Sequence, residues 1–311
     1  MSQKIKKFIK STPFLFFLFK AIYFFIKQIK TFLEKLQKQK LNKKKYNSIA
    51  NKIHLFKPGS AGDYKLIDQL TILSVNQTFP LIKNLIEFIN GTVKIITCDE
   101  FCENISDFNI QYAEELKDRF NFYKSDKSSL HDYYKVYAAI LLNRTEIKCL
   151  FEIGLGTNNE KIASNMSKFG TPGASLRAFR DFLPNALIYG ADFDKNILFE
   201  EDRIKTFFVD QTDISTFEPL YTSINQPIDV IIDDGLHAPN ANIASLLFAL
   251  KKTSNQNECW IIIEDITEPA VDVWKVISSL LPRKFYHTYI IKSKSSYMFV
   301  CHKISNVIVK N

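Results

Sequence analysis

The chain has 311 residues, of which 46% are hydrophobic, 14% aromatic and 24% charged, an ordinary globular composition with an excess of Phe. Its five cysteines are scattered without zinc-ligand spacing, which argues against a zinc site and suits a reducing compartment. The net charge of +8 is uneven: residues 1–45 hold thirteen Lys and one Glu, a net of +12, which leaves −4 for the other 266 residues. The body therefore offers no basic surface for nucleic acid.

Residues 1–45 are a basic arm around a Phe-rich stretch. Its charged and apolar residues fall on opposite sides at near-helical spacing: Lys20, Lys27, Lys30, Glu34 and Lys38 against Ile22, Phe25, Ile29, Phe32, Leu33 and Leu36. A spanning helix needs about 20 mostly apolar residues, and a signal peptide needs a small-residue cleavage site, so neither is favoured. The pattern predicts an amphipathic helix. It either lies on an anionic membrane or docks on the protein's own body or a sister subunit.

Residues 46–127 are expected to form an accessory or lid region without a chemical motif. Helices over 81–89 and 111–122 and a short strand over 92–97 are predicted there. From residue 128 the elements become regular, with helices over 128–142, 175–182, 240–251 and 271–281 and strands over 149–153, 187–192, 205–209, 228–232, 259–263, 285–292 and 296–302. This alternation predicts an α/β fold for residues 128–311: a Rossmann-like, doubly wound, mostly parallel seven-stranded sheet with a C-terminal antiparallel hairpin.

Two acidic clusters follow apolar runs that resemble buried parallel strands. The first contains Asp233, Asp234 and His237, and the second is Glu264-Asp265. The carboxyl ends of parallel strands open into the ligand crevice of such a sheet, so these groups should meet there. Crowded carboxylates favour a hard cation, and the imidazole beside them is a candidate base. Alternatively, Asp233 caps the following helix, His237 is structural, and the second cluster is a solvated strand end.

The first strand of the regular region ends in a glycine turn at Gly154 and Gly156. Glycines allow a sharp turn and close approach of a ligand to the backbone. A dinucleotide fingerprint would need Gly where Asn159 stands, and an acid about 20 residues on, whereas Asp192 lies 38 residues beyond Gly154. NAD is therefore disfavoured, and a nucleoside with a free ribose diol is expected at Asp192.

Several motifs together resemble a known family. Glu152-Ile153-Gly154-Leu155-Gly156, followed by Gly190-Ala191-Asp192, is similar to class I S-adenosylmethionine (SAM)-dependent methyltransferases. The resemblance sharpens with Gly173-Ala174-Ser175-Leu176-Arg177, Val209-Asp210-Gln211, Asp233-Asp234-Gly235-Leu236-His237 and Glu264-Asp265. The combination resembles the metal-dependent sugar O-methyltransferases of macrolide biosynthesis and, more distantly, the cephalosporin-hydroxylase-like group. It covers residues 128–302.

The resemblance implies the residues of the site. SAM would be bound by Glu152, Gly154, Gly156, Thr157, Asn158, Ser175, Asp192, Asp210, Gln211 and Asp233. Mg²⁺ would be bound by Asp234, Glu264 and Asp265, and His237 would be the catalytic base. Leu236 departs from the family, where a polar residue is usual.

Chemistry supports this choice of residue types. A sugar hydroxyl is a poor nucleophile, and a metal that lowers its pKa beside a base makes it attack the SAM methyl. The sequence thus predicts a SAM-dependent, Mg²⁺-assisted O-methyltransferase that acts on a sugar or glycosylated acceptor, either a surface polysaccharide or a natural product. The arm favours a cytoplasmic protein at the inner face of a membrane. The alternatives are an iron-dependent hydroxylase, which needs two His and one carboxylate, and a non-catalytic nucleoside-binding module. The sequence also allows the protein to form a homo-oligomer.

Overall fold

The structure, a computed structural model, describes residues 13–47, 52 and 64–305. It divides the chain into two units, Met1–Leu81 and Ile82–Asn311. The first unit contains α2 (Pro13–Asn47) and the greater part of α3 (Tyr64–Asn90), which continues through Pro80. The predicted helical arm is therefore confirmed from Pro13 on, whereas its first twelve residues lie outside the described part. The helix expected over 81–89 is only the end of α3.

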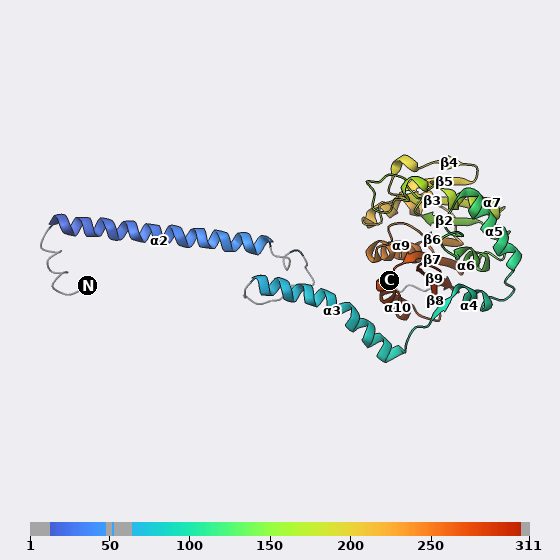
Figure 1. Ribbon diagram of the computed structural model, residues 1–311, viewed down its shortest axis with the longest axis horizontal. Coiled ribbons are helices and arrows are strands. Elements are labelled where there is room, and N and C mark those ends of the chain that lie inside the picture. The colour runs from blue at the N-terminus through green and yellow to red at the C-terminus, as the bar shows by residue number, and fades with distance from the viewer. Residues whose placement is uncertain (1–12, 48–51, 53–63, 306–311) are drawn as a thin grey trace. The chain divides into compact units, whose positions relative to one another are not determined.

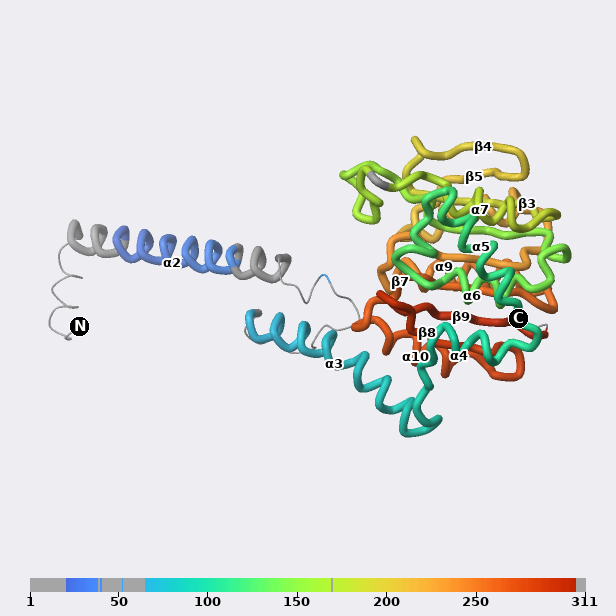
Figure 2. Tube along the Cα trace, turned by 45° about the vertical axis from the view of Figure 1, so that its right-hand side comes forward, coloured from blue at the N-terminus to red at the C-terminus, as the bar shows by residue number. Residues whose placement is uncertain are grey.

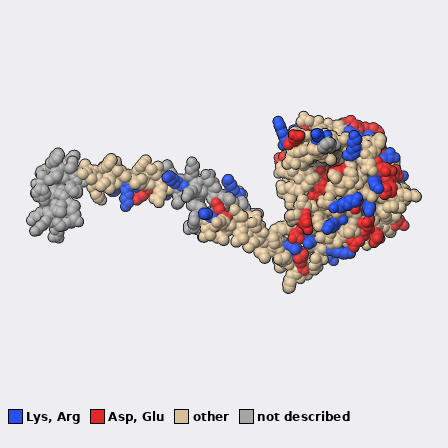
Figure 3. Space-filling view, in the orientation of Figure 1, with Lys and Arg blue, Asp and Glu red and all other residues tan. Residues whose placement is uncertain are grey.

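The apolar side chains of α2 are exposed. Tyr23, Phe25 and Phe32 are 70%, 63% and 62% exposed. Figure 3 shows a mostly uncharged helix surface with isolated Lys side chains, whereas the visible face of the second unit carries interspersed acidic and basic groups. No helix in the described ranges is long and apolar enough to cross a membrane.

The second unit is built around one mixed sheet (Figures 1 and 2). Its strands are β1 (Ile95–Thr97), β2 (Cys149–Ile153), β3 (Leu187–Asp192), β4 (Glu200–Glu201), β5 (Ile204–Phe208), β6 (Val230–Asp233), β7 (Cys259–Ile266), β8 (Tyr286–Lys292) and β9 (Tyr297–Lys303). Their order is β1-β8-β9-β7-β6-β2-β3-β5-β4. β9 is antiparallel to β7 and β8, and β4 is antiparallel to β5. The seven predicted strands and the terminal hairpin are confirmed, and short edge strands raise the total to nine.

Helices cover both faces of the sheet (Figure 1). They are α4 (Cys98–Glu103), α5 (Ile110–Tyr123), α6 (Tyr133–Ile140) and α7 (Ala174–Phe182), and α8 (Glu218–Ser223), α9 (Pro239–Lys252) and α10 (Val271–Leu280). Successive strand residues point to opposite faces, which divides the buried side chains into two cores. Leu150 packs with α4–α7, and its neighbour Phe151 packs with α8–α10. Both strand faces are buried, which explains why the central strands read as continuous apolar runs.

The segment expected to be accessory contributes to this core. β1 pairs in parallel with β8, and Phe101, Leu116 and Phe120 of α4 and α5 are fully buried. Function as a lid stays a prediction. The helix expected from residue 128 starts later, at Tyr133. Ser128 instead donates to the Asn121 side chain at 2.8 Å, so residues 124–132 form a loop between α5 and α6.

Candidate active site

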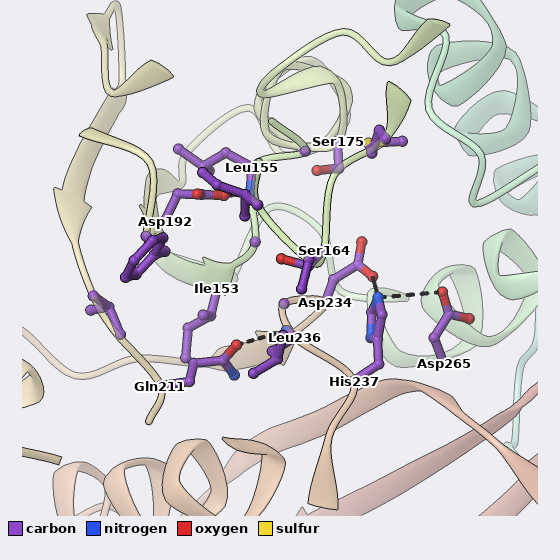
Figure 4. A pocket seen from close by; sticks show the side chains of 18 of the residues that line it. Ile153, Leu155, Ser164, Ser175, Asp192, Gln211, Asp234, Leu236, His237 and Asp265 are labelled. Atoms are coloured by element: carbon purple, nitrogen blue, oxygen red, sulfur yellow. Dashed lines mark hydrogen bonds and ion pairs between the residues drawn. The ribbon is translucent and has the colours of Figure 1, made fainter. Parts of the chain in front are cut away.

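A cavity of about 350 Å³ opens at the carboxyl ends of β2, β3 and β6 (Figure 4). Gly154 lines this cavity and has a left-handed backbone with φ of +99°. A Cβ atom at Gly154 would lie 2.0 Å from the carbonyl oxygen of Asp234. Glycine is therefore required where the loop after β2 passes the loop after β6.

Asp192 is fixed at one end of the cavity. Its carboxylate accepts from the Leu155 amide at 2.7 Å and from the Asp194 amide at 2.8 Å. Burial raises the pKa of Asp192 despite these two hydrogen bonds, which favour the ionised form. The carboxylate ties the glycine turn to the end of β3 and still lines the cavity.

Other predicted cofactor residues divide into two groups. Gly156, Ser175, Asp210 and Gln211 line the cavity with Gly154 and Asp192. The Gln211 amide is already engaged, since it accepts from the Leu236 amide and donates to Asp233 and Ser245, each at 2.8 Å. Gln211 therefore braces the loop after β6 as well as facing the cavity.

The remaining predicted cofactor residues do not line the cavity: Glu152, Thr157, Asn158 and Asp233. Thr157 donates to Asp194 at 2.6 Å, and Asn158 donates to the Gly170 carbonyl at 3.0 Å, so both stabilise the loop after β2. Asp233 points toward the α9 side, where it accepts from the Asn242 amide at 3.0 Å. Asp233 does not cap this helix, whose N-cap residue is Ala238, but its carboxylate holds the side chain of Asn242 in the first turn.

Three titratable groups meet at the other end of the cavity. His237 Nε2 lies 3.9 Å from Asp234 Oδ1 and 3.8 Å from Asp265 Oδ2 (Figure 4). His237 and Asp265 both have left-handed backbones, with φ of +56° and +51°. Such conformations cost on the order of 1–3 kcal/mol each outside glycine, and they concentrate at functional sites.

A β-bulge brings Asp265 into this group. The pairing of β7 with β9 shifts register between Ile263 and Ile266, so Asp265 leaves the regular alternation. Asp265 Oδ1 accepts from Tyr133 at 2.6 Å and from Ser296 at 2.8 Å. Burial raises the pKa of Asp265, but these hydrogen bonds and the nearby imidazoles outweigh it, and the pKa is lowered.

Behind Asp234 lies a buried charge cluster that sequence reasoning missed. The Lys127 ammonium, 1% exposed, lies 2.7 Å from Asp234 Oδ2 and Glu264 Oε2 and 3.2 Å from Glu152 Oε1. Tyr137 donates to the other oxygen of Glu264. No motif marks Lys127, because nothing local distinguishes it from the surface lysines.

The electrostatics of this cluster are dominated by burial. Burial raises the pKa of Glu152 to about 7 although Lys127 lowers it, and the pKa of Glu264 is raised well above its usual value. Burial lowers the pKa of Lys127, but its three carboxylate neighbours outweigh this effect, and the pKa is raised well above its usual value. Lys127 therefore stays protonated and carries a permanent positive charge.

Comparison with known proteins gives partial matches. No family model matches the chain. It is 29% identical over 143 residues to the 8-demethyl-8-alpha-L-rhamnosyl tetracenomycin-C 2'-O-methyltransferase of Streptomyces olivaceus, which covers 46% of this chain and 35% of the relative. It is 37% identical over 78 residues to the demethylmacrocin O-methyltransferase of Streptomyces fradiae, covering 25% and 19%. The chain thus matches about a third or less of these relatives' lengths.

Among solved structures, the chain superposes on the MycE methyltransferase of the mycinamycin biosynthetic pathway, in complex with Mg, S-adenosylhomocysteine (SAH) and mycinamycin VI. The TM-score is 0.51 at 20% identity, over 63% of this chain and 56% of MycE. The chain has the class I methyltransferase fold. In open α/β sheets, ligands bind in the crevice at the carboxyl ends of the strands, and the cavity lies there, among the loops after β2, β3 and β6.

The donor set at the His237 end of the cavity suits Mg²⁺. Asp234, His237 and Asp265 are the group of candidate metal ligands found among the described residues. Mg²⁺ takes oxygen ligands and keeps positions for water or substrate, and the carboxylates of Asp234 and Asp265 face the cavity with such space. An iron-dependent hydroxylase would need two imidazoles and one carboxylate; this group holds one imidazole, and the nearby His131, whose Nε2 lies 3.6 Å from Asp265 Oδ1, is outside it. Glu264 is set apart from the cavity by Lys127 and Tyr137.

Proposed function

We propose that this protein transfers a methyl group from SAM to a hydroxyl group of a sugar or glycosylated acceptor, with assistance from Mg²⁺. The observation that carries the proposal is one continuous cavity. The glycine turn and Asp192 lie at one end, and Asp234, His237 and Asp265 lie at the other. A cofactor and an acceptor bound at these ends would be adjacent, which is the main requirement of a direct group transfer.

At the cofactor end, Gly154 and Gly156 would let the SAM methionine group approach the backbone, and Asp192 would accept from the ribose hydroxyls. Ser175 and Asp210 also line this end of the cavity. Glu152 lies outside the cavity and accepts a 2.7 Å hydrogen bond from Ser175, which holds that side chain in place. Gln211 would border the adenine. Thr157, Asn158 and Asp233 would act indirectly, by fixing the loops.

At the acceptor end, His237 would be the base. Its Nε2 would accept the hydroxyl proton, the acceptor oxygen would take the methyl group, and the sulfonium of SAM would become the thioether of SAH. Mg²⁺, when bound, supplies a Lewis acid that lowers the pKa of the hydroxyl. Asp234 and Asp265 would hold it, with Glu264 as the proposed third ligand.

The acceptor class is supported by the Streptomyces olivaceus relative, whose name describes an O-methyltransferase of a rhamnosyl compound. The second acceptor that we propose is a surface polysaccharide. The test is incubation of purified protein with labelled SAM and candidate glycan extracts. Label in a sugar fraction supports the proposal, and label in no fraction, with the protein folded and SAH bound, contradicts it.

Cofactor choice has a separate test. Calorimetry should show saturable binding of SAH to the wild type, and Asp192→Ala should weaken it at least about tenfold, because the ribose loses an ionic acceptor. Ser175→Ala, which retains the backbone, is the milder comparison. Equal affinity in Asp192→Ala, or binding of NADH in place of SAH, would contradict the assignment.

We further propose that residues 1–45 bring the enzyme to an anionic membrane, which would make it a peripheral protein at the inner face and connect it to glycan biosynthesis. The support is the combination of thirteen Lys with exposed apolar side chains on α2. Lys side chains are attracted to anionic headgroups, and the Phe face gains from apolar burial. Docking in a homo-oligomer is the competing outcome.

A further inference from the structure

Lys127 is a charged residue of the buried cluster that the proposed chemistry does not use. It extends from the loop between α5 and α6, whose preceding residues Ser125 and Asp126 line the cavity. β2 and β7 direct Glu152 and Glu264 toward this layer, because these side chains leave the strands on the α4–α7 face. The loop thus inserts a cation beneath the candidate metal ligands.

The contacts of this cation are unequal. Its ammonium makes 2.7 Å hydrogen bonds with Asp234 Oδ2 and Glu264 Oε2. Its contact with Glu152 Oε1 is longer, 3.2 Å, and that oxygen has no hydrogen-bond partner among the described residues. Glu152 therefore offers a buried acceptor toward which the ammonium can move.

We propose that Lys127 and the divalent cation compete for Asp234 and Glu264, and that the ammonium moves toward Glu152 when the cation binds. This inference rests on the proposed metal-assisted function. Lys127 holds Oδ2 of Asp234 and Oε2 of Glu264, and Tyr137 holds the other oxygen of Glu264, so a cation that draws on these oxygens meets the ammonium as a competitor, above all at Glu264. Lys127 is then a positioning residue that weakens cation binding and keeps the carboxylates together.

The movement would also reach the cofactor end. Glu152 accepts from Ser175, which lines the cavity. A stronger Lys127–Glu152 bond would therefore fix the residue that supports Ser175. Lys127 would then link the two ends of the cavity, through Glu152 at the cofactor end and Asp234 at the acceptor end.

The experiment measures Mn²⁺ binding by the full chain, from the loss of the free-ion electron paramagnetic resonance signal. Mn²⁺ prefers the same oxygen ligands as Mg²⁺. Lys127→Met should bind Mn²⁺ at least about tenfold more tightly than wild type, because the competitor is gone. Lys135→Met, which removes a lysine paired with Asp99 outside the cluster, should bind like wild type.

Glu264→Gln identifies the contested carboxylate. It should cost more Mn²⁺ affinity in the Lys127→Met background than in the wild type, because in the wild type it also removes part of the competition. If Lys127→Met does not fold, the charge-balanced Lys127→Met/Glu264→Gln protein should still bind Mn²⁺ more tightly than Glu264→Gln alone, through Asp234.

The outcomes separate the inference from the function. Unchanged or weaker Mn²⁺ affinity without Lys127, with wild-type binding intact, overturns the competition and leaves the metal site standing. Absence of Mn²⁺ binding in every variant, with SAH still bound, overturns both the metal site and the competition. Tighter binding in Lys135→Met as well would reduce the effect to net charge and overturn the inference.

Discussion

The two units of this chain use the same apolar residue types in opposite ways. In the second unit, Phe101, Phe151 and Phe299 are fully buried between sheet and helices. On α2, Phe24 and Phe25 are 61% and 63% exposed. The charge is also uneven, because residues 1–45, within the first unit, carry +12 and the remainder of the chain −4. An apolar side chain that is buried stabilises the fold, whereas a helix that exposes a row of them beside lysines is suited to another surface. We therefore expect changes in the arm to affect membrane binding without affecting SAH binding, and changes in the candidate site to leave membrane binding intact.

The largest effect should come from removing the metal. EDTA should abolish methyl transfer and added Mg²⁺ should restore it, because Asp234 and Asp265 then lose the cation that activates the acceptor. Turnover of labelled SAM measures this, and liposome binding should be unaffected in the same samples. Full turnover in the chelator would contradict metal assistance.

His237→Ala should reduce kcat by about 10²–10⁴-fold, the usual contribution of a general base. SAH affinity should stay unchanged, because His237 lies at the acceptor end of the cavity. The exposed His287, on β8 and outside the cavity, provides the matched control, and His287→Ala should retain wild-type turnover. An active His237→Ala protein would place the base elsewhere.

Deletion of residues 1–46 should reduce binding to anionic liposomes at least about 100-fold at low salt, since each Lys near the surface contributes up to about 1 kcal/mol. SAH affinity should remain. Co-sedimentation measures the first and calorimetry the second. Salt should weaken binding by the full chain without eliminating it, because apolar burial is not screened. If the full chain ignores liposomes and the deletion breaks an oligomer, the arm is a docking helix.

The smallest effect concerns pH and stability. The pKa of Glu152 is raised to about 7, so the folded state binds more protons than the unfolded state between pH 4.5 and 7. Stability should therefore fall as pH rises through this window, with a contribution on the order of 2 kcal/mol from this carboxyl. Glu152→Gln should flatten the change in urea unfolding between pH 5 and pH 8.

The exposed Glu34 of α2 is the matched control, and Glu34→Gln should leave the pH dependence as in the wild type. An equally steep pH dependence in Glu152→Gln would show that other carboxyls of the cluster take the protons.

The sequence predicted the sheet better than the site. β2 and β3 begin and end where the apolar runs do, because strands buried on both faces leave a strong local pattern. The edge strand β4 was not predicted, because its two glutamates carry no strand signal. α6 was predicted to begin too early, because serines that resemble a helix start instead close a loop.

At the site, residues with a motif could be located, but their partners could not. Asp234, His237 and Asp265 were expected together, and the structure brings them together. Lys127 lies 107 residues before Asp234 in the chain, and only the folded arrangement of three strand ends reveals it. The same limit applies to Gln211, whose amide is used within the protein.

The left-handed backbones of His237 and Asp265 place stability and activity in opposition. A glycine adopts such φ values without steric cost, whereas alanine does not. His237→Gly should therefore be inactive yet more resistant to unfolding than His237→Ala, by about 1 kcal/mol. Selection of this protein for thermostability alone would therefore favour the loss of His237, the proposed base.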